Sequence, residues 1–140
     1  MERQKCYASA GLARMLKEAM AAERMAIHNY DLLLEAAQEE DVREDIRHIR
    51  REEKRHYVLL EGMYEEMTGL EYAVGRAPAS MPQNYYDMIR TSICDELEAV
   101  NFYEYLAKEI DCEIQRATVW EIMNEEKEHA RILASIYRRA

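Results

Sequence analysis

Glycine and proline are scarce in this sequence, with four and two residues among 140, and aromatic residues make up only 9%. A β-sheet protein needs many turns rich in glycine and proline, so their scarcity argues against a sheet. The chain is filled instead with strong helix formers: Ala, Leu, Met, Glu, Lys and Arg. This composition predicts an all-α protein, and the length predicts one domain covering residues 1–140.

Cysteine and long apolar runs are also lacking. Cys6, Cys94 and Cys112 are an odd, widely spaced set without a Cys-x-x-Cys pair. We therefore expect neither a disulfide framework nor a thiolate metal site, and we expect a reducing compartment. The polar first residues and the absence of a long apolar segment predict no signal peptide and no transmembrane helix. The expected location is the cytoplasm, with no membrane partner.

Positive charge is in the minority, because 19 Lys and Arg residues face 28 Asp and Glu residues and give a formal net charge of −9. Non-specific binding to nucleic acid needs a basic face, so we predict no nucleic-acid partner. Most of the carboxylates are expected to keep the surface soluble. Those that fall on an apolar helix face need another explanation.

The pattern Glu-Glu-x-x-His occurs twice, ending at His56 and at His129. On a helix, the second Glu and the His lie on one face about one turn apart, which is a spacing suited to metal ligands. In a chain so rich in Glu, a single copy of this pattern would indicate only a solvent-exposed helix face. Two copies with matching flanks predict a shared site. The first Glu of each copy, Glu52 and Glu125, is expected in solvent or beside the ligands.

Apolar residues recur at intervals of three and four in four segments, which predict four helices. The expected helices run from the N-cap Ser9 to about Gln38, from a capping box at Asp41 and Glu44 to about Met67, from the N-cap Asn84 to about Ile110, and from Asp111 or Glu113 to the last residues, 137–140.

The region of about residues 68–84 holds two glycines and both prolines, and the helical periodicity stops there. It is long enough to recross the bundle, so the sequence predicts an antiparallel four-helix bundle of two helical hairpins joined by a long crossover. The alternative is a flexible linker between separate hairpins, which would leave the apolar face of each hairpin uncovered.

Glu23 interrupts the apolar stripe of the first predicted helix. An unpaired buried carboxylate is costly, so Glu23 requires a metal ion, a salt bridge to an Arg of another helix, or a helix rotated enough to expose it.

On the third predicted helix, Glu96 and Glu98 compete for the inward position. The spacing Glu23-x6-Tyr30 reappears as Glu98-x6-Tyr105, displaced by 75 residues (98 − 23 = 75). That displacement is close to the 73 residues between the repeated histidines (129 − 56 = 73), and it favours Glu98. Tyr30 and Tyr105 then either donate hydrogen bonds to ligating carboxylates or are ordinary interior tyrosines.

The predicted site contains four glutamates and two histidines at inward positions. They are Glu23, Glu53, His56, Glu98, Glu126 and His129. One Glu from each of two helices and a Glu-x-x-His from each of the other two form the ligand set of dinuclear iron or manganese centres in helical bundles. Four carboxylates neutralise two divalent ions. We assign bridging roles to Glu53 and Glu126 and terminal roles to Glu23 and Glu98.

The segment from Glu23 to Tyr30 and the two Glu-Glu-x-x-His segments resemble the ferritin-like superfamily, in particular its rubrerythrin and bacterioferritin branches. The resemblance covers essentially residues 12–137. It implies a di-iron centre at the six residues, oxidation of Fe(II) by O₂ or hydrogen peroxide, and a homodimer or larger homo-oligomer. No rubredoxin domain with Cys-x-x-Cys pairs is present, so an external electron donor is expected. Lys54 stands where bacterioferritin has its haem-ligating methionine, so no haem is expected, and Asn101 replaces an additional carboxylate of many rubrerythrins.

The predicted function is that of a di-iron oxidoreductase, a ferroxidase or peroxidase serving oxidative-stress defence or iron handling. It would bind two iron ions, with manganese as the alternative metal. The other hypotheses are a non-catalytic iron-binding or storage protein, a di-iron hydroxylase of an organic substrate, and an interaction module without metal in which salt bridges pair the six polar residues.

Overall fold

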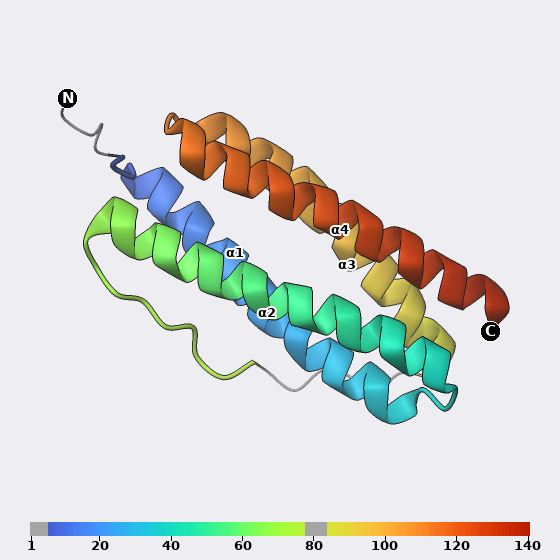
Figure 1. Cartoon of the computed structure of the whole chain (residues 1–140). Helices are drawn as coiled ribbons and strands as arrows, with labels where there is room; N and C mark the ends of the chain where they lie inside the picture. Colours follow the sequence, from blue (N-terminus) through green and yellow to red (C-terminus); the bar gives the residue numbers. More distant parts are fainter. Residues whose placement is uncertain (1–5, 78–83) are drawn as a thin grey trace.

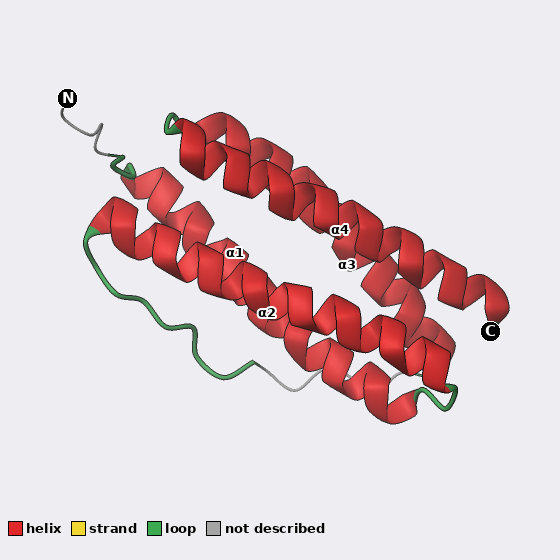
Figure 2. Cartoon of the chain, in the orientation of Figure 1, coloured by secondary structure: helices red, strands yellow, loops and turns green. Residues whose placement is uncertain are grey.

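The computed structural model describes residues 6–77 and 84–140 and contains four α-helices in them, with no strand. The helices are α1 (Ala10–Ala36), α2 (Glu40–Thr68), α3 (Tyr85–Glu109) and α4 (Glu113–Arg139). Figures 1 and 2 show α1 and α2 as one antiparallel hairpin and α3 and α4 as a second. The hairpins pack together, α1 against α3 and α2 against α4. The predicted four-helix bundle of two hairpins is confirmed.

Two helix starts agree with the sequence. The Ser9 hydroxyl accepts a hydrogen bond from the Leu12 N–H at 3.1 Å, and the Asn84 side chain accepts one from the Asp87 N–H at 2.9 Å. Each satisfies a backbone donor that has no partner within its own helix. Ser9 and Asn84 are therefore the N-caps of α1 and α3, as predicted.

The start of α2 differs from the prediction. Its N-cap is Glu39, which makes no capping hydrogen bond with its side chain, while the Asp41 carboxylate accepts from the adjacent Val42 N–H at 2.9 Å. The predicted capping box at Asp41 is wrong because the helix already begins at Glu40. α2 ends at Thr68, and its C-cap Gly69 has a φ of 74°, in the left-handed region that glycine adopts without strain.

The connection between the hairpins begins at Gly69 and ends at Asn84, in agreement with the predicted crossover at about residues 68–84. Its described part, residues 69–77, runs alongside the first hairpin from one end of the bundle toward the other (Figure 1). The Val74 N–H donates to the Tyr57 hydroxyl at 3.3 Å and attaches this part to α2. The remainder of the predicted crossover, residues 78–83, lies outside the described residues.

The apolar core is divided into two clusters. One gathers residues such as Leu16, Leu60 and Leu106 toward one end of the bundle, and the other gathers residues such as Leu33 and Ile46 toward the opposite end. In α1 the first cluster extends to Met20 and the second begins at Tyr30. The buried Glu and His residues of the four helices lie between the two clusters. Apolar packing on both sides therefore keeps water away from a polar layer at the middle of the bundle.

A disulfide joins Cys6 to Cys112, with the two Cα atoms 5.8 Å apart. It ties the segment before α1 to the turn between α3 and α4. The same segment is also fastened to α2, because the Ala8 N–H donates to the Met67 carbonyl at 3.0 Å. The prediction that no cysteines pair is wrong, since the 106 residues between the partners give no local motif. The third cysteine, Cys94, is exposed and free.

None of the helices in the described part of the chain is long and apolar enough to cross a membrane.

Candidate metal centre

Six side chains form the polar layer between the apolar clusters, and each is at most 2% exposed. They are Glu23 on α1, Glu53 and His56 on α2, Glu96 on α3, and Glu126 and His129 on α4. Burial of four carboxylates in one layer is costly unless cations or protons balance their charge.

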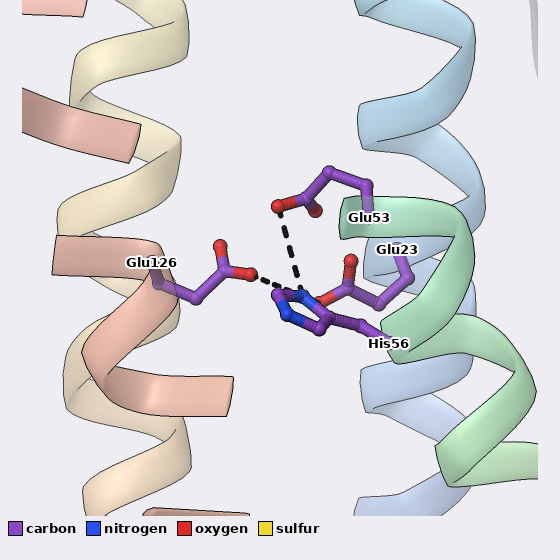
Figure 3. Close-up of side chains that lie close together, drawn as sticks. All are labelled: Glu23, Glu53, His56 and Glu126. Carbon is purple, nitrogen blue, oxygen red and sulfur yellow. Dashed lines mark ion pairs between the residues drawn. The ribbon is translucent and has the colours of Figure 1, made fainter. Parts of the chain in front are cut away.

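These residues form two overlapping groups, and in each group the possible ligand atoms all lie within 4.8 Å of one another. The first group is Glu23, Glu53, His56 and Glu126, and the second is Glu53, Glu96, Glu126 and His129. Figure 3 shows the first group, in which the two carboxylates and the imidazole of the first hairpin point toward Glu126 of the second. Glu53 and Glu126 belong to both groups.

The structure does not bring Glu98 into this cluster. Glu98 is exposed, whereas Glu96 is 2% exposed and faces the other carboxylates. The predicted ligand on α3 is therefore corrected to Glu96. Two residues correspond to a rotation of about 200° on a helix, so the error moves the side chain to the opposite face. The displacement that relates the repeated histidines also relates Glu23 to Glu96 (96 − 23 = 73), and this was the signal that could have identified it.

The prediction that Tyr105 faces the interior is wrong for the same reason. The side chain of Tyr105 is 58% exposed, whereas Tyr103 is buried. The Tyr103 hydroxyl donates to Glu23 Oε1 at 2.5 Å, and the Tyr30 hydroxyl donates to Glu96 Oε1 at 2.5 Å. Each tyrosine thus orients a carboxylate of the other hairpin. Burial, reinforced by these carboxylates, raises the pKa of both phenols well above the usual value, so they stay protonated donors.

Both histidines are held from the side away from the carboxylate cluster. His56 Nε2 lies 3.0 Å from Glu125 Oε2, and His129 Nε2 lies 3.1 Å from Glu52 Oε1. A proton on Nε2 can be donated to these carboxylates, which leaves the Nδ1 lone pair directed into the cluster. Glu52 and Glu125, the first residues of the repeated motif, therefore lie beside the two histidines.

Each residue of the layer has a buried atom with no hydrogen-bond partner among the described residues. These atoms are Glu23 Oε2, Glu53 Oε1, His56 Nδ1, Glu96 Oε2, Glu126 Oε1 and His129 Nδ1. His56 Nδ1 lies 2.7 Å from Glu126 Oε1, yet neither atom makes a hydrogen bond of acceptable geometry. Buried polar atoms are rarely left without partners, and a cation between them would satisfy these six. The donor set therefore fits divalent metal ions.

The pKa values show how strongly these residues interact. Burial, followed by the charges of Glu23 and other carboxylates, raises the pKa of Glu53 and Glu126 well above the usual value. Burial lowers the pKa of His56, but the adjacent carboxylates of Glu126 and Glu23 outweigh it and raise the pKa to about 11. Without a metal the layer therefore retains protons, and metal ions must displace them.

Glu52 and Glu125, which contact the two histidines, differ in their other neighbours. Glu52 also lies 2.9 Å from His48 Nε2, whereas Glu125 pairs with the permanent cation Arg55. Partial burial raises the pKa of Glu125, but hydrogen bonding with Glu52, His56 and Arg55 lowers it to about 2. The two halves of the centre are thus similar in their inner residues and different in the charges behind them. The His48–Glu52 contact lies within α2, whereas the Arg55–Glu125 contact joins α2 to α4 and could not be predicted from local sequence.

No protein-family model matches the chain. The uncharacterized protein YhjR of Bacillus subtilis (strain 168) is 30% identical to it over 119 residues, which make up 85% of this chain and 81% of YhjR. This chain belongs to the family of YhjR.

Two solved structures resemble this YhjR relative. The hypothetical protein Pfu-1136390-001 from Pyrococcus furiosus matches with a TM-score of 0.81 and 25% identity over 91% of this chain and 88% of its own. A two-domain protein from Anabaena variabilis ATCC 29413, which contains DJ-1/ThiJ/PfpI-like and ferritin-like domains, matches with a TM-score of 0.73 and 19% identity. That match covers 95% of this chain and 38% of the two-domain protein, and it concerns the fold alone. It supports a ferritin-like fold.

Proposed function

We propose that this protein is a di-iron oxidoreductase that reduces O₂ or hydrogen peroxide. The observation that supports it is the set of six buried atoms that make no hydrogen bond among the described residues, in two groups that share Glu53 and Glu126. Oxygen ligands with one imidazole per ion suit iron or manganese, whereas zinc sites usually have four ligands and fewer carboxylates. A bound iron pair supplies two electrons, which with two protons reduce hydrogen peroxide to water or O₂ to hydrogen peroxide.

In this proposal Glu53 and Glu126 would help to hold both ions, because they belong to both groups. Glu23 and His56 complete one position, and Glu96 and His129 complete the other. This is the ligand set predicted from the sequence, with Glu96 in place of Glu98. Four carboxylates balance the charge of two divalent ions, which removes the cost of burying them.

The surrounding residues orient the ligands. The protonated hydroxyls of Tyr30 and Tyr103 hold one oxygen of Glu96 and of Glu23 and leave the second oxygen directed into the cluster. Glu52 and Glu125 hold the histidine rings by Nε2. These contacts keep the ligands in place before an ion arrives, so less ordering is required on binding. An external electron donor, a homodimer or larger homo-oligomer, and a cytoplasmic location remain predictions.

The test is an anaerobic Fe(II) titration of metal-free protein, followed by mixing with O₂ and, separately, with hydrogen peroxide while the near-ultraviolet spectrum is recorded. We expect two irons per chain and rapid formation of ferric absorption, with the faster oxidant indicating the physiological reaction. Tight binding followed by oxidation no faster than that of free Fe(II) would favour the storage protein. Absence of stoichiometric binding would leave the six residues as a structural layer.

Glu96→Gln and Glu98→Gln provide a matched pair of variants two residues apart on α3. Glu96→Gln should weaken binding of one iron because it removes a charged ligand from one group. Glu98→Gln should retain both irons, because Glu98 is exposed. Equal iron binding by the two variants would contradict the assignment.

A further inference from the structure

A cavity of about 350 Å³ lies between α1 and α3 and reaches the carboxylate layer. Glu23, Glu53, Glu96 and Glu126 all line it, but neither histidine is among the described residues that do. The histidines are held by Glu52 and Glu125, which line a separate groove together with α4 residues. The cavity therefore reaches the cluster on the side of its carboxylates and away from its two histidines.

Small side chains create this cavity. Ala19, Ala22 and Ala26 line it from α1, and Ser92 and Ala99 line it from α3. On α1 the three alanines are three and four residues apart, so they share one face of the helix. A leucine at any of these positions would extend into the space. The wall is mostly apolar, and Met25 and Phe102 add larger apolar surfaces to it.

The inner end of the cavity is polar. Glu23 and Glu96 are each 2% exposed, and Oε2 of each has no hydrogen-bond partner among the described residues. The titratable side chains of the wall comprise carboxylates and two phenols, and the described lining residues include no Lys, Arg or His. A negatively charged ligand would find no basic side chain among these residues and would lie against the carboxylates of Glu23 and Glu96. A hydroxyl group could donate a hydrogen bond to an unpaired carboxylate oxygen.

We propose that this cavity binds a small, uncharged organic molecule whose apolar body contacts the alanines and whose oxygen-bearing end points to the carboxylate layer. The volume is near the lower end of the range for small-molecule sites, about 300–1,000 Å³, which restricts the ligand to a short chain or a single ring. The binding itself does not depend on the proposed redox chemistry. If both hold, the ligand lies beside the metal pair as an organic substrate or product.

The test uses metal-free protein in EDTA, labelled with ¹³C at the methionine methyl groups, and titrated with 1-hexanol. The Met25 methyl resonance is identified by its loss in Met25→Leu. We expect a saturable shift of this resonance, because Met25 lines the cavity. Hexanoate, which has the same number of carbons but a negative charge, should bind at least about tenfold more weakly, as expected when a charge is buried without a partner.

Ala26→Leu should weaken hexanol binding at least about tenfold because it fills the cavity. Ala21→Leu is the matched control, because Ala21 is exposed on the same helix and is not among the lining residues. If circular dichroism shows that Ala26→Leu is unfolded, Ala99→Leu is used in its place, because it fills the cavity from α3. The proposal is overturned if hexanol causes no saturable shift of the Met25 resonance or if hexanoate binds as tightly as hexanol. It is also overturned if Ala21→Leu weakens hexanol binding as much as the cavity-filling variant does. Because no metal is present, hexanol can bind even if the iron titration fails, and the reverse also holds.

Discussion

Replacing Tyr103 by Phe removes one hydroxyl from the buried layer and changes the shape of the side chain very little. The lost hydrogen bond is the one donated to Glu23 Oε1 at 2.5 Å. A buried hydrogen bond to a charged group contributes about 1.5–3 kcal/mol, and its loss leaves a buried carboxylate oxygen without its donor. We therefore expect Tyr103→Phe to lower the free energy of unfolding of the metal-free protein by about 1.5–3 kcal/mol.

The assay is urea unfolding at pH 7 in EDTA, followed by circular dichroism. Tyr105→Phe is the control, since it makes the same chemical change on the same helix at a residue that is 58% exposed. A surface change of this kind is expected to stay within about 0.5 kcal/mol. Tyr30→Phe should behave like Tyr103→Phe, because its hydroxyl donates to Glu96 in the same way. If Tyr103→Phe and Tyr105→Phe differ by less than about 0.5 kcal/mol, the assigned role of the buried phenols is wrong.

Three further outcomes are expected. Reduction of the Cys6–Cys112 disulfide, or Cys112→Ser, should lower the free energy of unfolding in urea by about 2–4 kcal/mol because it releases a long loop, whereas Cys94→Ser should leave it unchanged. In an Fe(II) titration, Glu53→Gln should weaken binding of both irons because Glu53 belongs to both groups, whereas His56→Ala should remove one iron. Retention of two irons by both variants would refute the shared site. Because the folded-state pKa of His56 is raised from 6.5 to about 11, its protonated form stabilises the metal-free protein fully below pH 6.5. Urea midpoints should therefore fall as the pH rises from 6.5 toward 11, and a flat profile identical to that of His56→Ala would contradict this.

Much of the fold could be predicted because helices are local. Apolar intervals of three and four residues indicated all four helices, and the caps Ser9 and Asn84 were correct because a cap involves neighbouring residues only. The start of α2 was missed because Asp41 and Glu44 imitate a capping box inside a helix that begins at Glu40. The inward faces of α1, α2 and α4 followed from a single apolar stripe on each.

The inward face of α3 did not follow in this way. Apolar residues occupy two adjacent lines on this helix, so Glu96 and Glu98 both met the pattern. Packing against α1 and α4 decides the rotation of α3 about its axis and places Glu96 inside. The constant displacement of 73 residues would have selected Glu96 from the sequence (129 − 56 = 73 and 96 − 23 = 73).

The sequence by itself determined the four helices and five of the six residues of the polar layer, because side-chain direction along a helix depends on periodicity alone. Only the tertiary structure decided which atoms meet between helices. The hydrogen bond from the Tyr30 hydroxyl to Glu96 and the pairing of Cys6 with Cys112 both join residues far apart in the chain. Their proximity follows from how the two hairpins pack. Such contacts depend on the relative position and rotation of whole helices, which no local pattern records.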